Sequence, residues 1–222
     1  MRFEAVLFDC DGVLVDSEPI TNGVLRDMLA EAGWALTPQE CMRLFVGKAV
    51  KDEAALIEQH TGRPLTEDWL RDFRERRNVA LLRDLQAIRN AHVAVQAVHA
   101  RAQGRIACAS GADRHKVEIQ LRKVELLPYF DGRIFSGHEM PRSKPAPDVY
   151  LAAMDALAVR AAHCAVVEDT ATGVRAGVDA GALVLGYVPS HAPADTAQQL
   201  RDAGALHLFD DMAQLPDLLA RV

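Results

Sequence analysis

Short apolar runs alternate with amphipathic stretches along most of this chain. Helical spacing fills the intervals at 91–101, 113–125, 146–157 and 171–179; in 113–125, Val117, Leu121 and Val124 recur at i, i+4 and i+7. Strands that alternate with helices predict an α/β fold with a parallel sheet covered on both faces. The predicted strands are EAVLF (4–8), RIACA (105–109), 133–135, HCAVV (163–167) and ALVLGYV (182–188).

A long helical block interrupts this alternation directly after the first strand. From about residue 17 to residue 85 no strand pattern occurs, and Pro38 and Pro64 lie near breaks between helices. We therefore expect a small helical domain inserted into an α/β core. Its predicted helices are 18–32, 37–44, 50–60 and 66–84.

Composition narrows the class of protein and its partners. Half of the 222 residues are apolar and the net charge is −6, which disfavours a surface for nucleic acid or anionic membranes. No apolar run approaches the length of a membrane helix, and a strand that starts near residue 4 leaves no room for a signal peptide. The four cysteines lack metal-ligand spacing, so we expect buried reduced thiols and a cytoplasmic protein.

Polar residues follow four of the predicted strands. In an open parallel sheet, ligands bind beyond the carboxyl ends of the strands, so these residues are expected to meet at one edge. Taken singly, each is as well explained by a turn, a surface lysine or a helix N-cap. The combination and its order indicate a site made of Asp9, Asp11, Ser110, Gly111, Lys144, Glu168 and Asp169.

The chemistry of this set favours a phosphate and a metal ion. Carboxylates that lie together without a cationic partner repel one another. Mg²⁺, which binds oxygen ligands, commonly offsets such negative charge beside a phosphate. Lys144 would attract an anion, and Ser110 with the backbone N–H groups of the loops would hold phosphate oxygens. A carboxylate can also accept a phosphoryl group as a nucleophile.

Four ordered motifs resemble those of the haloacid dehalogenase superfamily, in the subgroup similar to β-phosphoglucomutase. DCDGVLVDSE (9–18) is similar to the first motif of the family and ASG with Ser110 to the second. SKPAPD with Lys144 is similar to the third and VEDTATG (167–173) to the fourth. The resemblance covers essentially the whole chain. It implies a Rossmann-like core of residues 1–16 and 86–222, a helical cap of residues 17–85, and Mg²⁺ as cofactor.

The resemblance also implies a role for each residue of the site. Asp9 would attack phosphorus to form an aspartyl-phosphate, and Asp11 would protonate the leaving group and then activate water. Ser110 and Lys144 would hold the phosphoryl group. The metal ligands would be the Asp9 carboxylate, the Asp11 backbone carbonyl and Asp169, with Glu168 either a further ligand or a group behind the ligands.

Departures from the family pattern separate its subfamilies. Dehalogenases lack the second aspartate, so Asp11 argues against dehalogenation. The mutase has a histidine twelve residues after the nucleophile, where this chain has Thr21, which favours a phosphatase over a phosphomutase. The usual Pro-Gly before the helix that follows the cap is replaced by AIRNAHVAV (87–95). Within the phosphatases, the first motif and IFSGHEMPRSKPAPD (134–148) are most similar to 6-phosphogluconate phosphatases.

The expected substrate is a small phosphorylated sugar, and the expected assembly is a monomer or a weak dimer. Gly111, Gly47, Lys48 and Arg77 are the candidate substrate contacts: FVGKAVKDEA (45–54) is similar to the specificity loop of the family, and Arg77 interrupts an apolar stripe on the predicted helix 66–84. The alternative for Arg77 is a side chain that only reaches out to water from the edge of the stripe. Two other functions are alternatives to a phosphatase: that of a phosphoglucomutase and that of a non-enzymatic receiver-like signalling module.

Overall fold

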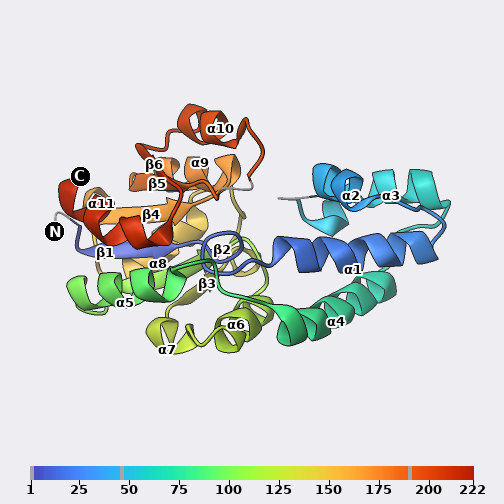
Figure 1. The fold of residues 1–222 in the computed structure, drawn as a ribbon, viewed down its shortest axis with the longest axis horizontal. Helices are drawn as coiled ribbons and strands as arrows, with labels where there is room; N and C mark the ends of the chain where they lie inside the picture. The colour runs from blue at the N-terminus through green and yellow to red at the C-terminus, as the bar shows by residue number, and fades with distance from the viewer. Residues whose placement is uncertain (1–2, 46–47, 190–191) are drawn as a thin grey trace. The chain divides into compact units, whose positions relative to one another are not determined.

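The structure is a computed structural model that describes residues 3–45, 48–189 and 192–222. The chain divides into two compact units, Met1–Asp16 with Gln86–Val222 and Ser17–Leu85. We call the first the α/β unit and the second the helical unit (Figure 1).

The α/β unit contains a six-stranded parallel sheet in the order β3-β2-β1-β4-β5-β6. This arrangement confirms the predicted α/β fold class. The strand order reverses between β1 and β4, and in parallel sheets such a switch point opens a crevice for ligands. The strands are β1 (Ala5–Phe8), β2 (Ile106–Ser110), β3 (Ile134–Ser136), β4 (Cys164–Glu168), β5 (Leu183–Tyr187) and β6 (His207–Phe209).

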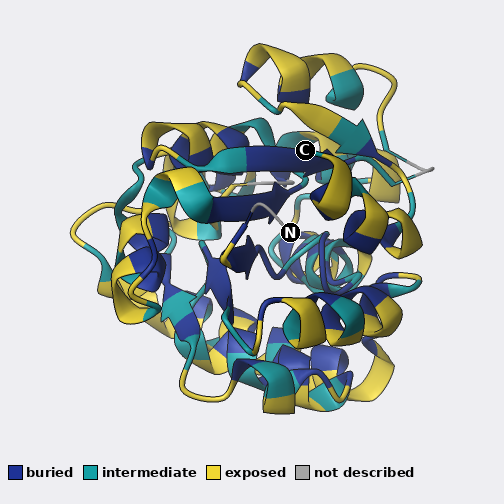
Figure 2. Cartoon of the chain, turned by 90° about the vertical axis from the view of Figure 1, so that its left-hand side faces the viewer, coloured by how far each residue is buried: buried dark blue, intermediate teal, exposed yellow. Residues whose placement is uncertain are grey.

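Helices cover both faces of this sheet, so β1, β2 and β4 are buried along their whole length (Figure 2). Neighbouring strand residues point to opposite faces. On one face, Leu7 belongs to the core formed with α8 (Asp148–Ala156), α9 (Ala171–Asp179) and α10 (Thr196–Asp202). On the other, Phe8 packs edge-on against Phe130 at 5.9 Å between ring centres. Phe130 ends α7 (Leu127–Phe130); α5 (Ala91–Arg101) and α6 (Arg114–Lys123) contact α7, and α11 (Leu215–Arg221) contacts α5.

The helical unit consists of α1 (Glu18–Glu31), α2 (Pro38–Phe45), α3 (Ala54–Thr61) and α4 (Glu67–Asp84) around its own apolar core. The predicted helix 50–60 was wrong in its first turn, because Val50–Glu53 is a short 3₁₀ turn. Gly62 ends α3 with a φ of 67°, and the Thr66 hydroxyl accepts a hydrogen bond from Trp69 N to start α4. Three other 3₁₀ turns, Gly137–Glu139, Ala161–His163 and Met212–Gln214, belong to the α/β unit.

Two segments that flank the helical unit in sequence run side by side within the α/β unit. Asp16 N donates to Gln86 O and Ile88 N donates to Leu14 O, each at 3.0 Å. Asn90 then adopts a left-handed φ of 63° at the start of α5, a conformation that asparagine tolerates. Its side chain donates to Asp211 at 2.7 Å. This is how the chain turns here without the usual Pro-Gly.

In the described part of the chain, no helix has the length and apolar character needed to cross a bilayer. Cys10, Cys41, Cys108 and Cys164 are all buried free thiols, as the sequence predicts.

Candidate active site

Asp9 and Lys144 form the centre of the site, at the carboxyl end of β1. Asp9 follows the strand directly, and its N–H continues the ladder by donating to Val167 O at 3.0 Å. Only 8% of Asp9 is exposed. Lys144, in the loop between β3 and α8, donates from Nζ to Asp9 Oδ1 at 2.6 Å and to Ala109 O at 2.9 Å. The sheet thus brings together two residues that lie far apart in sequence.

Glu168, the last residue of β4, is the most deeply buried acid of the site, with 1% exposure. Its Oε1 accepts from Lys144 Nζ at 2.6 Å and from the Tyr150 hydroxyl at 2.8 Å. Its Oε2 accepts from Asp169 N, Thr170 N and Thr170 Oγ1 at 3.1–3.3 Å. A side chain on Gly173 would collide with this carboxylate, since an added Cβ would lie 1.7 Å from Oε1.

Asp169 begins the loop after β4 and lies beside the first motif. A Cβ added to Gly12 would lie 1.9 Å from Asp169 Oδ2, so only glycine leaves room for this carboxylate. Gly12 also has a φ of 79°, which glycine adopts without strain. Asp9, Glu168 and Asp169 each place a carboxylate oxygen within 4.8 Å of the others, an arrangement that could hold a metal ion.

The charges within this group are unbalanced. Burial raises the pKa of Asp9 to about 7, with further increases from Glu168 and Asp11, while Lys144 opposes them. Burial also disfavours the charge on Lys144, but the carboxylates of Asp9 and Glu168 outweigh it and hold the pKa of the ammonium well above its ordinary value. Three carboxylates against one ammonium leave two negative charges in excess. A divalent cation would match that excess.

Asp11 is held by a different set of partners. Lys116 Nζ, on α6, donates to both carboxylate oxygens of Asp11 at 2.8 and 2.9 Å. Gln120 Nε2, one turn further along α6, donates to Oδ1 at 2.7 Å. Sequence reasoning missed both residues. Their only signal was a lysine and a glutamine at i, i+4 beside the apolar stripe of the helix at 113–125.

Ser110 ends β2, the strand that pairs with β1, and it is buried. Its Oγ accepts from Ala112 N at 3.1 Å, and Ser136 Oγ donates to Ala112 O at 2.7 Å. These bonds fix the turn that contains Gly111. Ser110, Gly111 and the acidic residues of the candidate site therefore lie at or just beyond the ends of neighbouring strands, and Lys144 reaches them from the loop after β3.

In the helical unit, the candidate substrate contacts Lys48 and Arg77 each have a partner within that unit. Lys48 is exposed and pairs with Glu53 at 3.2 Å. Arg77 is buried on α4, donates twice to Asn78 Oδ1, and lies 6.0 Å from the centre of the Phe73 ring. Gly47 lies outside the described residues.

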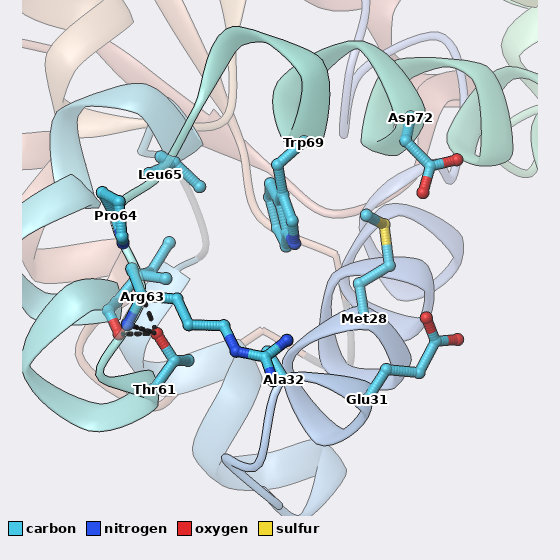
Figure 3. Close-up of a pocket in the computed structure, with 10 residues that line it drawn as sticks. Met28, Glu31, Ala32, Thr61, Arg63, Pro64, Leu65, Trp69 and Asp72 are labelled. Atoms are coloured by element: carbon cyan, nitrogen blue, oxygen red, sulfur yellow. Dashed lines mark hydrogen bonds between the residues drawn. The ribbon is translucent and has the colours of Figure 1, made fainter.

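The helical unit also has a half-open pocket of about 230 Å³ (Figure 3). Trp69 and Leu65 project into it from α4 and the segment before it, and Met28 faces them from α1. The charged residues on its wall are Glu31, Arg63 and Asp72; Glu31 and Arg63 are exposed, and Asp72 is half-buried. The pocket is therefore apolar inside and carries none of the buried charge that marks the end of β1.

Comparison with known proteins defines the class. The family model for haloacid dehalogenase-like hydrolases matches residues 3–181, a range that contains every carboxylate of the candidate active site. The chain belongs to the haloacid dehalogenase-like hydrolases, and it is an enzyme.

Individual proteins of this family are similar to the chain over almost its whole length. The chain is 31% identical over 219 residues to 6-phosphogluconate phosphatase of Escherichia coli K12, covering 98% of this chain and 95% of the relative. A haloacid dehalogenase-like protein of unknown function from Agrobacterium tumefaciens superposes with a TM-score of 0.83 at 32% identity over 98% of each chain. A family hydrolase from Deinococcus radiodurans, solved with bound phosphate and sodium, has a TM-score of 0.80 at 33% identity and covers 99% of this chain and 96% of that one.

Proposed function

We propose that this protein is a Mg²⁺-dependent phosphatase that hydrolyses a small sugar phosphate through an aspartyl-phosphate on Asp9. The observation that carries the proposal is the group at the end of β1, where Asp9, Glu168 and Asp169 lie together and Lys144 Nζ bonds Asp9 and Glu168. Perturbed, buried ionisable groups at a switch point of the strand order are typical of an active site.

The donor set fits a hard divalent cation. Asp9 and Asp169 offer carboxylate oxygens, the ligands that Mg²⁺ prefers, and the backbone carbonyl of Asp11 would complete the protein's share. The oxygens of Glu168 already accept the hydrogen bonds from Lys144, Tyr150, Asp169 and Thr170, so we assign Glu168 to anchoring that lysine and that loop. When bound, the cation would offset the charge of the phosphoryl oxygens.

The residues of the chain would then divide the reaction between them. A carboxylate oxygen of Asp9 forms a bond to phosphorus, the bond from phosphorus to the leaving oxygen breaks, and the carboxyl proton of Asp11 moves to that oxygen. In the second step water attacks the aspartyl-phosphate and gives a proton back to Asp11, which releases phosphate and the Asp9 carboxylate. Lys144 and Ser110 hold the phosphoryl oxygens throughout.

A sugar phosphate is the substrate class that the relatives favour. The E. coli relative acts on 6-phosphogluconate, and a relative from Thermotoga maritima is a phosphorylated carbohydrates phosphatase, 28% identical over 213 residues. The bound phosphate of the Deinococcus structure supports a phosphate site in this fold. We assign the choice among sugars to the helical unit, acting as a cap, through Lys48 and Arg77.

The test is phosphate release from a panel of sugar phosphates, starting with 6-phosphogluconate, in Mg²⁺ and in excess EDTA. We expect release that requires Mg²⁺ and that falls at least about a thousandfold in Asp9→Asn, because the amide cannot act as the nucleophile. Release that persists in Asp9→Asn, or no release from any sugar phosphate, would refute the proposal. Interconversion of glucose 1-phosphate and glucose 6-phosphate without release would indicate a phosphomutase instead.

Substrate contacts in the helical unit are tested separately. If Arg77 binds a substrate carboxylate, Arg77→Met raises KM for 6-phosphogluconate more than for glucose 6-phosphate, which has no carboxylate. An equal change for both substrates would show that Arg77 only packs against Phe73.

A further inference from the structure

The Asp11 carboxylate accepts three hydrogen bonds from two side chains of α6. Lys116 Nζ reaches Oδ1 at 2.8 Å and Oδ2 at 2.9 Å, and Gln120 Nε2 reaches Oδ1 at 2.7 Å. Three charge-assisted hydrogen bonds leave a short side chain little freedom to rotate. The direction of the Asp11 carboxylate is therefore set by a helix and not by the loop that carries it.

The donors to Asp11 are distinct from the donors to Asp9. Lys144 donates to Asp9, Glu168 and Ala109 O, whereas Lys116 and Gln120 donate to Asp11. Two carboxylates two residues apart are thus drawn to two different ammonium groups, one from the loop after β3 and one from α6. The arrangement keeps like charges apart, and it lets each carboxylate be aimed independently.

The helix is built to present these two side chains at a buried position. Asp113 caps α6 by accepting from Lys116 N at 2.8 Å, which places Lys116 in the first turn beside the Ser110 loop. Gln120 is fully buried, and its other amide atom, Oε1, accepts from Cys10 Sγ at 3.5 Å. Burying a lysine and a glutamine on a helix face costs free energy that apolar residues would not cost. The polar contacts to Asp11 offset this cost.

We propose that Lys116 and Gln120 are positioning residues that hold the Asp11 carboxyl group in line with the leaving-group oxygen. The inference rests on the proposed phosphatase reaction, in which Asp11 gives its proton to that oxygen as the phosphorus–oxygen bond breaks. Without the two contacts Asp11 rotates, and proton transfer to the leaving oxygen slows. Attack by Asp9 itself is untouched.

This role makes a prediction that depends on the leaving group. A sugar alkoxide is a poor leaving group that needs the proton, whereas p-nitrophenolate departs readily without it. The quantity to measure is kcat/KM, which reports steps up to formation of the aspartyl-phosphate. Its value for p-nitrophenyl phosphate divided by its value for the best sugar phosphate gives a ratio that general damage to the fold leaves unchanged.

We expect this ratio to rise about tenfold or more in Lys116→Met and about threefold in Gln120→Met, against about a hundredfold in Asp11→Asn. Lys116→Arg, which keeps the charge and the donors, should return the ratio part of the way to that of the wild type. The matched control is Arg122→Met, which removes a positive charge from an exposed position of the same helix and should leave the ratio unchanged.

The outcomes separate this inference from the proposed function. No phosphatase activity in the wild type would refute the function. A ratio that rises in Asp11→Asn but stays at the wild-type value in both folded variants, Lys116→Met and Gln120→Met, would overturn the positioning role alone. If Lys116→Met fails to fold, Gln120→Met and Lys116→Arg decide. In the Asp11→Asn background, Lys116→Met should add nothing to the ratio, and a further rise would also contradict the role.

Discussion

The ion pairs of the candidate active site and those of the helical unit lie in opposite environments. At the end of β1, the acids Asp9 and Glu168 are buried together with Lys144 and, nearby, Lys116. In the helical unit the ion pairs, such as Arg76 with Glu31, lie at the surface. Buried charges are expensive to desolvate, so they are seldom found without a function, whereas exposed pairs contribute little. The burial of its charges, more than their number, distinguishes the candidate active site from the rest of the surface.

Among the substitutions that test this contrast, removal of a buried ammonium should have the largest effect on stability and activity. Lys144→Met leaves Asp9 and Glu168 buried without their shared cation, so we expect the free energy of unfolding to fall by about 3–5 kcal/mol and kcat to fall by about a hundredfold or more. Urea unfolding at pH 8 and the sugar-phosphate assay measure the two effects. The control for stability is Lys48→Met, which removes an exposed ammonium paired with the half-buried Glu53. Equal destabilisation by the two variants would contradict the contrast.

Substitution of one left-handed glycine in each unit gives a second test of this contrast. Gly12→Ala must place a Cβ on Asp169, so we expect the Mg²⁺ dependence of activity to shift to higher concentration and kcat/KM to fall at least about tenfold. Gly62→Ala meets nothing within 4 Å in the described structure and should cost only the left-handed strain, about 1 kcal/mol. Mg²⁺ titrations of activity, with thermal unfolding of both variants, test this. Gly12→Ala with wild-type Mg²⁺ dependence would show that Asp169 is not crowded by position 12.

A buried thiol gives a smaller, pH-dependent effect. Burial raises the pKa of Cys164 to about 12, from an ordinary value of 9.0. Because the folded pKa is the higher one, the stability that the neutral thiol contributes is present below pH 9 and lost as pH rises toward 12. Relative to Cys164→Ala, the wild type should lose about 2 kcal/mol between about pH 8 and about pH 10.5. Denaturant unfolding across this range measures the difference, and parallel curves for the two proteins would contradict it.

The smallest effect is expected at the exposed ion pairs of the helical unit. Arg76 bonds Glu31 in a bidentate manner at 2.8 and 2.9 Å and also pairs with Asp72, yet all three side chains are open to water. We expect Arg76→Met to leave the thermal midpoint and kcat/KM within error of the wild type, at low and at high salt. A clear, salt-sensitive loss of stability would mean that these surface charges act as a network.

The sequence predicted the fold and much of the site because both follow from local patterns. Buried strands read as apolar runs, and polar residues that follow such runs must meet at one sheet edge, which is why Asp9, Ser110 and Glu168 could be identified. Lys116 and Tyr150 could not, because they reach the site from helix faces, where a polar residue beside an apolar stripe has many explanations. Arg77 shows the same ambiguity within the helical unit. The role of a polar residue on a helix face can be assigned only when the packing of that helix shows which residues it contacts.

The paired backbone segments beside the helical unit also bear on how such a protein could be rebuilt. The chain leaves and re-enters the α/β unit at Asp16 and Gln86, which are joined by a hydrogen bond of 3.0 Å. An insertion whose two ends are already adjacent can be exchanged for a different helical module, or for a short turn, with little change to the strands beneath it. The protein is modular in this sense: one continuous segment can be swapped while the residues at the strand ends stay in place.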